Sequence, residues 1–242
     1  VSVSYTITTY SGTTNVGSNS YTKTCSIPAS VKPKVTALSL SDATDCYTKF
    51  GNFVKGYSKF KVTVTPEKAY GSEITSYTTT ANGSTYSAAS FTTGVIKTAG
   101  TLTVSATVKD KRGRTSDAFT KTGKVIDYSP PKLGTFKVYR CTAGFVESDD
   151  GAFVAVEVSQ SITQLNGKNS ATVLIQYKKT SSSKYTDLDS YTIDETSNQA
   201  GKLKFAADTG SSYHVKVTIT DQLATTTRSA EVSTSDVIMH WK

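Results

Sequence analysis

Val215-Lys216-Val217-Thr218-Ile219-Thr220-Asp221 is the stretch that decides the fold, because apolar and polar side chains alternate along it. Alternation with a period of two is typical of a β-strand with one buried face. The pattern also occurs as Val3-Ser4-Tyr5-Thr6-Ile7-Thr8-Thr9 and as Val104-Ser105-Ala106-Thr107-Val108-Lys109-Asp110, and successive copies start 101 and 111 residues apart. A repeat of this length predicts a string of similar domains.

Each copy of the repeat is followed by a short turn and then by a threonine-rich segment. The turns are Tyr10-Ser11-Gly12, Lys111-Arg112-Gly113 and Gln222-Leu223-Ala224. An alternating strand, a turn and a second strand predict a β-hairpin. We therefore expect each copy to form the last hairpin of its domain.

Proline-containing segments follow the first two hairpins, at residues 27–33 and 128–132. Proline has no backbone N–H and cannot continue a central strand, so these segments predict linkers. Residues 1–31 are then the C-terminal hairpin of an upstream β-sandwich domain, and residues 32–129 and 130–242 are two complete sandwiches.

Two strands alone bury too little apolar surface to be stable by themselves. We therefore expect a partner protein or another copy of the chain to cover the apolar face of residues 1–31.

Further short segments with strand character complete both domains. We expect strands at residues 35–40, 59–65, 74–80, 85–87, 102–109 and 115–125, and at 135–139, 153–158, 171–178, 185–193, 202–205, 213–220 and 226–239. Phe153 and Val156 are expected to anchor the core of the last domain. This spacing predicts an all-β fold of tandem immunoglobulin-like or fibronectin type III-like β-sandwich domains. No stretch of twelve or more residues keeps a helical period, so we expect almost no helix.

The composition agrees with a β-rich protein. The 242 residues include 41 Thr and 32 Ser, and 27 basic residues outnumber 19 acidic ones to give a net charge of +8. Threonine favours strands, and the modest positive charge favours mild attraction to anionic surfaces. No apolar run approaches 18 residues, which argues against a membrane span. Because the chain begins with Val1 and shows no leader, we expect it to be a processed piece of a longer polypeptide.

The reactive residues of the sequence form no recognisable catalytic or ligand-binding motif, so we expect no enzymatic activity, cofactor or metal. His214 and His240 have no ligand spacing, and neither a G-x-S-x-G motif nor a glycine-rich phosphate loop is present. The three cysteines are expected to be buried reduced thiols, with a Cys25–Cys46 bridge as the alternative.

Acidic residues occur in pairs, which could suggest the two carboxylates of a glycosidase. The pairs are Asp149-Asp150, Asp187 with Asp189, and Asp194-Glu195. Turns and strand ends explain each pair more simply. A calcium site at Glu147, Asp149 and Asp150 is a minor alternative, because hard oxygen ligands gather there without a complete loop pattern.

Two segments are candidates for binding. Tyr47, Phe50, Phe53 and Tyr57 lie in one glycine-containing segment, where the rings could stack on saccharide, although packing over the end of the sandwich is the simpler interpretation. Lys109, Lys111, Arg112 and Arg114 could contact an anionic surface, although a solvated hairpin tip or an inter-domain contact explains them as well. The basic segment lacks interleaved aromatic residues and a helix, so it does not predict nucleic-acid binding.

Several motifs resemble the repeat domains of minor structural proteins from long-tailed siphophages of Gram-positive bacteria. They are Thr9-Tyr10-Ser11-Gly12, Val16-Gly17-Ser18, Asp127-Tyr128-Ser129-Pro130-Pro131, Tyr139-Arg140-Cys141, Asp149-Asp150-Gly151-Ala152-Phe153, Leu165-Asn166-Gly167-Lys168-Asn169-Ser170 and Gln176-Tyr177-Lys178. The resemblance extends over nearly the whole chain, and the Asn-Gly-Lys-Asn-Ser block is its most distinctive part.

The resemblance implies a virion protein of the tail or adsorption apparatus. Its sandwiches would act as spacers and as weak binders of host cell-wall saccharide, assembled with other virion proteins or with further copies of the chain in a homo-oligomer. It implies neither a nucleic-acid nor a membrane partner, and it carries over no catalytic residue. The rival classes are a bacterial surface adhesin and a carbohydrate-binding accessory module of a wall hydrolase.

Overall fold

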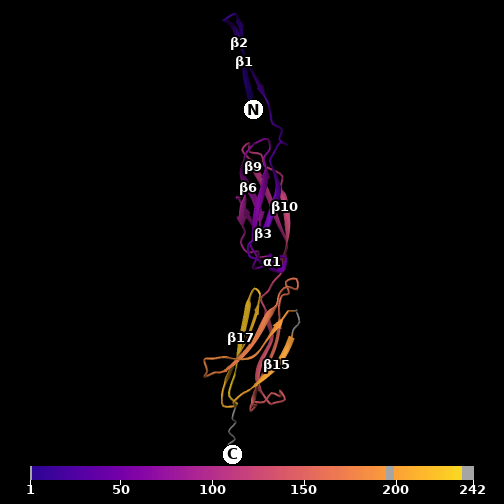
Figure 1. Ribbon diagram of the computed structural model, residues 1–242, viewed down its shortest axis with the longest axis vertical. Helices are drawn as coiled ribbons and strands as arrows, with labels where there is room; N and C mark the ends of the chain where they lie inside the picture. Colours follow the sequence, from indigo (N-terminus) through magenta and orange to yellow (C-terminus); the bar gives the residue numbers. More distant parts are fainter. Residues whose placement is uncertain (1, 195–198, 236–242) are drawn as a thin grey trace, which may run out of the picture. The chain divides into compact units, whose positions relative to one another are not determined.

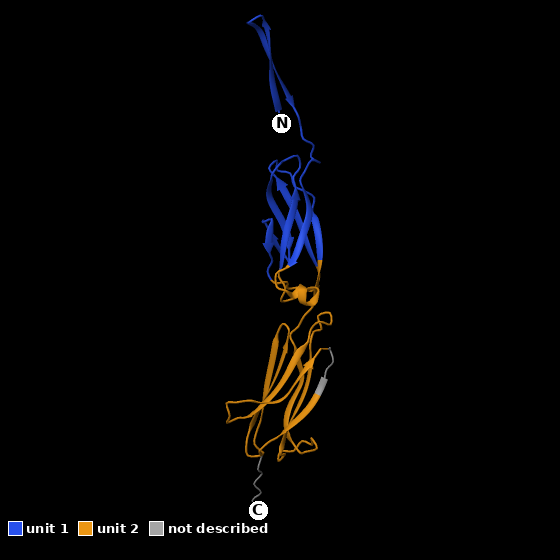
Figure 2. Ribbon diagram, in the orientation of Figure 1, with its two compact units in different colours: residues 1–41, 60–94, 102–122 blue, residues 42–59, 95–101, 123–242 orange. Residues whose placement is uncertain are grey.

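The computed structural model describes residues 2–194 and 199–235 of the chain (Figure 1). Within these residues the elements are strands, apart from the single short helix α1 (Cys46–Phe50). The prediction of an all-β fold with almost no helix is confirmed. The chain forms two compact units, which Figure 2 colours separately: residues 1–41, 60–94 and 102–122 make unit 1, and residues 42–59, 95–101 and 123–242 make unit 2.

Unit 1 contains a separate hairpin and most of a two-sheet sandwich. The hairpin is β1 (Ser2–Ser11) with β2 (Thr14–Thr24). One sheet of the sandwich has the order β3 (Lys34–Asp42), β5 (Phe60–Glu67), β8 (Ser90–Thr92). The other has the order β10 (Phe119–Ile126), β9 (Gly100–Asp110), β6 (Ile74–Ala81), β7 (Ser84–Tyr86). β10 ends in unit 2, where it pairs in parallel with β4 (Phe53–Val54).

Alternation in the sequence explains the core of this sandwich. Phe60, Val62 and Val64 of β5 are buried at every second position, and the residues between them are more exposed. The strand β9 buries Leu102, Val104, Ala106 and Val108 in the same way. Burial of aliphatic side chains on the inner face of each sheet is the main favourable contribution to such a fold.

Unit 2 contains the C-terminal sandwich. Its first sheet has the order β11 (Lys132–Cys141), β12 (Phe153–Ser161), β15 (Gln199–Ala206), and its second has the order β14 (Thr186–Ile193), β13 (Ala171–Lys179), β16 (Tyr213–Asp221), β17 (Thr225–Val232). A single core between the sheets includes Val156, Val173, Ile175, Val217 and Ile219. This arrangement of three and four strands is typical of immunoglobulin-like and fibronectin type III-like domains.

The three repeat copies are strands β1, β9 and β16, and each lies beside the strand that follows it in the chain. The first and third copies are hairpins as expected. In the second copy the returning strand begins at Phe119 and not at Thr115. The turn itself stays tight, because Asp110 accepts hydrogen bonds from the backbone N–H groups of Arg112 and Arg114 and an isolated bridge already joins Lys109 to Thr115.

Two details of the expected strands are wrong. Val156 is fully buried in the core, whereas Phe153 lies on the opposite face of β12 beside Tyr139 and Cys141. The reason is geometric, because residues separated by three positions point to opposite faces of a strand. The three-residue strand β8 was not expected, since it is too short to show a period. Residues 236–239 of the last expected strand lie outside the described residues.

Candidate functional site

Two of the four rings proposed as a saccharide site are buried. Phe50 has no exposed surface and Phe53 is nearly as buried, so neither can present a ring face to a ligand, and their assignment as saccharide contacts is wrong. Tyr57 is partly buried and packs edge-on against Tyr128, with ring centroids 5.1 Å apart. Tyr47 is 48% exposed. The four rings therefore form no common surface, and packing is the main role of this segment.

The segment that carries these rings, residues 46–57, packs on the C-terminal sandwich within unit 2. Cys46 and Phe50 of α1 form a small apolar cluster with Val54, Tyr128 and Leu165. The side-chain amide of Asn166 also donates a hydrogen bond to the carbonyl oxygen of Phe50, over 2.8 Å. This cluster joins residues from both sides of Pro130, the position at which a domain boundary was expected. The predicted boundary remains a prediction, but it does not coincide with a gap in packing.

The carboxylate of Asp221, at the end of the third repeat copy, organises the polar contacts beside this cluster. It accepts hydrogen bonds from the Tyr128 hydroxyl over 3.1 Å, from the Asn169 amide over 3.0 Å, and from the backbone N–H groups of Leu223 and Ala224. Burial and the adjacent negative charge raise the pKa of Tyr128 well above its usual range, so its hydroxyl remains a donor. Tyr128 and Asn169 belong to the phage-like motifs, and the structure assigns both a structural role.

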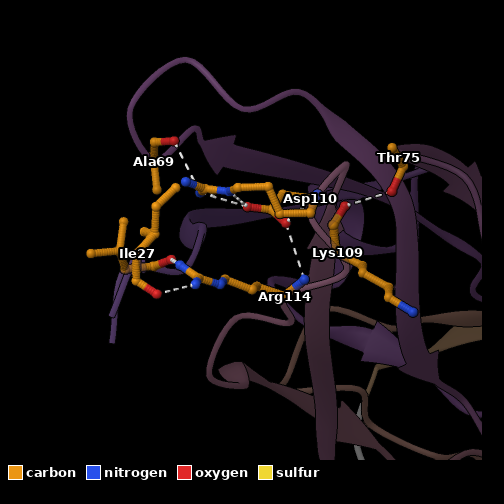
Figure 3. A network of polar contacts seen from close by, with 8 residues as sticks. Ile27, Ala69, Thr75, Lys109, Asp110 and Arg114 are labelled. Carbon is orange, nitrogen blue, oxygen red and sulfur yellow. Dashed lines mark hydrogen bonds and ion pairs between the residues drawn. The ribbon is translucent and has the colours of Figure 1, made fainter. Parts of the chain in front are cut away.

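Asp110, at the equivalent position of the second copy, holds the basic turn of unit 1 (Figure 3). Its carboxylate accepts hydrogen bonds from the backbone N–H and the guanidinium of Arg112, the shortest over 2.7 Å, and from the backbone N–H of Arg114. Arg112 also donates to the carbonyl of Ala69 over 3.1 Å, and Arg114 donates to the carbonyls of Val31 and Ile27. The turn therefore fixes the linker near residue 31 and the loop near residue 69.

This network corrects the expected anionic contact surface. Arg112 and Arg114 are only partly exposed, and both guanidinium groups are engaged by the chain itself. Lys109 and Lys111 are exposed. The four residues were one candidate anionic contact, but the two arginines bind carbonyl groups of the chain itself, so they are not available to an anionic surface. The repeat predicted the aspartates as strand-end residues and could not predict their partners, which come from distant segments.

A groove lies next to the network, between the linker and the loop that Arg112 and Arg114 hold. It is lined by Ser30, Val31, Lys32, Lys34, Glu67, Lys68, Ala69 and Tyr70. Tyr70 is the most exposed large hydrophobic residue of the described part of the chain, at 89%. Its exposure could not be predicted from the sequence, because a single tyrosine between an alanine and a glycine shows no pattern. The groove is the candidate functional site.

Acid should weaken unit 1 through Asp110. Burial opposes ionisation of this carboxyl, but Arg112 and the backbone N–H groups outweigh burial and lower its pKa. A lowered pKa in the folded state stabilises the fold above the unfolded value of about 3.9, and this stabilisation is lost as the pH falls through the folded pKa. The protection factors of the β9 amides, which compare the observed exchange rate with the rate of an unstructured chain at the same pH, should therefore fall below about pH 4.

The variant Asp110→Asn is the control for this pH dependence. Its β9 amides should have lower protection factors than those of the unmodified chain at pH 6, and these protection factors should fall less between pH 6 and pH 2.5. Asp127, Glu157 and Asp208, whose pKa values are also lowered, lie in unit 2 and do not enter the comparison. Equal acid sensitivity of both proteins in β9 would contradict the assigned role of Asp110.

The hairpin β1–β2 has two different faces, and both are exposed. One face carries four hydroxyl pairs at 2.8–3.1 Å: Ser2 with Thr24, Ser4 with Thr22, Thr6 with Ser20, and Thr8 with Ser18. The other carries Val3, Ile7 and the stacked rings of Tyr5 and Tyr21. In β16–β17 the hydroxyl pairs likewise occupy the outer face, and the apolar face is buried. The exposed apolar side of β1–β2 thus corresponds to the side of β16–β17 that is buried.

A second group of aromatic and basic residues lies on the outer face of β11, β12 and β15. The ammonium groups of Lys202 and Lys204 lie over the ring of Phe145, at 5.2 and 4.3 Å from its centroid. Lys202 also pairs with Glu157 over 2.9 Å, and Lys204 donates to the carbonyl of Ala143. Because these lysines are used by the chain itself, we interpret the group as a small packed cluster that covers Cys141.

Several of the remaining candidates contact other residues of the chain, whereas Glu195 and His240 lie outside the described residues. Glu147 pairs with Lys137 over 2.7 Å, Asp187 accepts a hydrogen bond from the amide of Gln176, and His214 lies 3.6 Å from Glu231.

In residues 2–194 and 199–235 no group of three or more potential ligands could hold a metal ion, so the calcium alternative has no support. Cys46 and Cys141 are buried, but Cys25 is exposed, so the expectation of a buried thiol is wrong for Cys25. The described cysteines form no disulfide. No helix of the described residues is long and apolar enough to cross a membrane.

Comparisons with known proteins give one family and several structural likenesses. The family model described as "Siphovirus protein of unknown function (DUF859)" matches residues 2–242. No relative was found among curated proteins.

Among solved structures, a Ca²⁺-stabilized adhesin that helps an Antarctic bacterium reach out and bind ice is similar over 97% of this chain and 56% of its own, with 16% identity and a TM-score of 0.45. The FN1–FN3 domains of chicken CNTN1 are similar over 72% of this chain and 61% of theirs, with 11% identity and a TM-score of 0.33. The chain spans less than two thirds of either of these solved chains.

Proposed function

The chain belongs to this siphovirus protein family, and from that premise we propose that it is a non-enzymatic structural component of the phage particle. The observation that carries the proposal is the match over residues 2–242 together with a fold of repeated β-strands and sandwiches. The buried carboxylates of Asp110 and Asp221 hold turns, and they accept hydrogen bonds from groups of the chain itself. Polar groups that are satisfied within the chain support a role as a spacer.

We further propose that the protein belongs to the tail or adsorption apparatus of a long-tailed phage of Gram-positive bacteria. Sandwiches of this kind resist deformation along the chain, and repeated copies multiply weak contacts through their effective concentration. The net charge of +8 favours approach to anionic wall polymers. Weak binding of host cell-wall saccharide is therefore the second part of the proposed function.

The exposed apolar face of β1–β2 supports assembly with other β-sandwich segments. In the third repeat copy the equivalent face is covered by the sheet β11–β12–β15. We propose the same cover for the first copy, as residues 1–31 would be the closing hairpin of a further sandwich. Burial of each of its large side chains would contribute about 1.5–3 kcal/mol.

Quantitative mass spectrometry of purified particles tests the main proposal. We expect peptides of this chain in particles purified by density gradient, at a fixed ratio to the major tail protein. Antibody labelling in electron micrographs should then mark the tail or its tip. Peptides present in the lysate of infected cells but absent from purified particles would contradict a virion role, and a label on the capsid would contradict the tail assignment.

A further inference from the structure

We propose that the groove between residues 30–34 and 67–70 of unit 1 binds an anionic saccharide polymer, with Tyr70 stacking on a sugar ring and Lys34 and Lys68 contacting its acidic groups. The inference names a site and a ligand class for the saccharide binding in the proposed function, and it rests on that function for the surface that the protein meets. It also moves the binding site away from residues 47–57.

Tyr70 is held in a conformation that its own side chain does not favour. Its φ angle is +47°, in the left-handed region that bulky residues rarely occupy. Such a conformation costs about 1–3 kcal/mol and persists only where the surrounding structure enforces it. At the same time the ring is 89% exposed, so packing does not repay the cost. A strained backbone that presents an aromatic ring to solvent is a reason to look for a ligand.

The surrounding contacts explain how the strain is maintained. The carbonyl of Ala69 accepts hydrogen bonds from the guanidinium of Arg112 and from the backbone N–H of Ser72, both over 3.1 Å. On the other side of the loop, the N–H of Lys111 donates to the carbonyl of Glu73 over 2.8 Å. Arg112 is itself held by the buried carboxylate of Asp110. The loop is therefore fixed before any ligand arrives, which reduces the entropic cost of binding.

Charge determines the class of ligand. Lys34 and Lys68 line the groove and are exposed, and their ammonium groups form no hydrogen bond or ion pair with the residues that the structure describes. Lys32 is partly neutralised by Asp117, at 2.5 Å, and Glu67 is the only acidic residue of the lining. Two available ammonium groups favour phosphate or carboxylate.

A saccharide polymer fits the combination better than a nucleic acid does. Single-stranded nucleic acids are held by several stacked rings along a groove, whereas this groove has one ring. One aromatic face with flanking ammonium groups matches a chain in which sugar rings alternate with acidic groups. The exposed lysines give weak, salt-sensitive contacts, so repetition of the ligand along a polymer would be needed for firm attachment.

Titration calorimetry of the 242-residue chain with purified glycosylated poly(ribitol phosphate) tests the inference. Tyr70→Ala should weaken binding about tenfold, as is usual when a tyrosine at the centre of a contact is truncated. The double variant Lys34→Gln/Lys68→Gln should weaken polymer binding at low salt and remove most of the salt dependence of the affinity. Tyr70→Gly relieves the left-handed strain, so it should lose binding without lowering the melting temperature, which separates binding from a structural role.

Matched controls lie outside the groove. Tyr10→Ala removes another exposed tyrosine, and Lys97→Gln with Lys124→Gln removes two other exposed lysines. Both should bind as the unmodified chain does. The unmodified chain should bind polymer without glycosyl groups about as weakly as Tyr70→Ala binds the glycosylated polymer. It should bind single-stranded DNA more weakly than the glycosylated polymer.

Three outcomes would overturn the inference: no heat with the polymer, equal losses in groove and control variants, or tighter binding of DNA. Failure here is distinguishable from failure of the proposed function. Polymer binding that the groove and control variants weaken equally contradicts the groove alone, and a chain found in particles that does not bind the polymer leaves the virion role intact. A chain that binds the polymer but is absent from particles contradicts the virion role alone.

Discussion

Replacing Ile219 by alanine is expected to lower the free energy of unfolding of the C-terminal sandwich by about 2–5 kcal/mol. Ile219 lies in β16 and is fully buried between the two sheets. Removal of its side chain loses transfer free energy and leaves a cavity, because the neighbouring strands relax only in part. Hydrogen exchange of the amides of β13 and β16 measures the change where it occurs.

Ile7→Ala is the matched control, since Ile7 holds the same position in the first repeat copy. Its side chain is 54% exposed, so truncation should change stability by less than about 0.5 kcal/mol. The result also tests the proposed cover of this face. A cost similar to that of Ile219→Ala, or strong protection of β1 amides that grows with protein concentration, would mean that another copy already buries the hairpin.

Asp221→Ala is expected to destabilise unit 2 by roughly 3–5 kcal/mol, because several buried donors lose their acceptor together. These donors are the Tyr128 hydroxyl, the Asn169 amide and the backbone N–H groups of residues 223 and 224. Asp221→Asn keeps one acceptor oxygen and should cost less. Because Tyr128 packs with Phe50 and Leu165, the loss should also reach α1, and exchange of α1 amides should accelerate.

Asp187→Ala controls for removal of a carboxylate. Asp187 is exposed and accepts one hydrogen bond from the amide of Gln176, so its loss should cost less than about 0.5 kcal/mol. Thermal unfolding at pH 7 provides the comparison. If Asp221→Ala and Asp187→Ala shifted the melting temperature equally, the Asp221 hydrogen bonds would not stabilise unit 2. Tyr128 and Asn169 would then need another role.

Much of the fold could be predicted, because a strand with one buried face leaves its period in the sequence. Strands β5, β9, β13 and β16 were recognised in this way. The failures occurred where the signal was too short or ambiguous. β8 has three residues, and Phe153 was placed with Val156 because both are apolar, although a spacing of three positions puts them on opposite faces.

The candidate site could be predicted much less well. Phe50 and Tyr70 are both aromatic residues in loop-like sequence, but the first is enclosed by segments around residues 128 and 165 and the second projects into solvent. Arg112 and Arg114 looked like a basic surface until the carbonyls of residues 27, 31 and 69 were found beside them. In both cases the deciding neighbours are tens of residues away along the chain.

Alternation alone therefore established that this chain forms β-sheets, that its strands recur in three copies, and which face of each strand is apolar, since side chains on a strand point to opposite faces in turn. It did not establish which apolar faces are covered. Ile7 and Ile219 occupy the same place in the same pattern, yet one is exposed and the other buried. Only packing against strands distant in sequence makes that difference, because burial is a property of a side chain's neighbours in space.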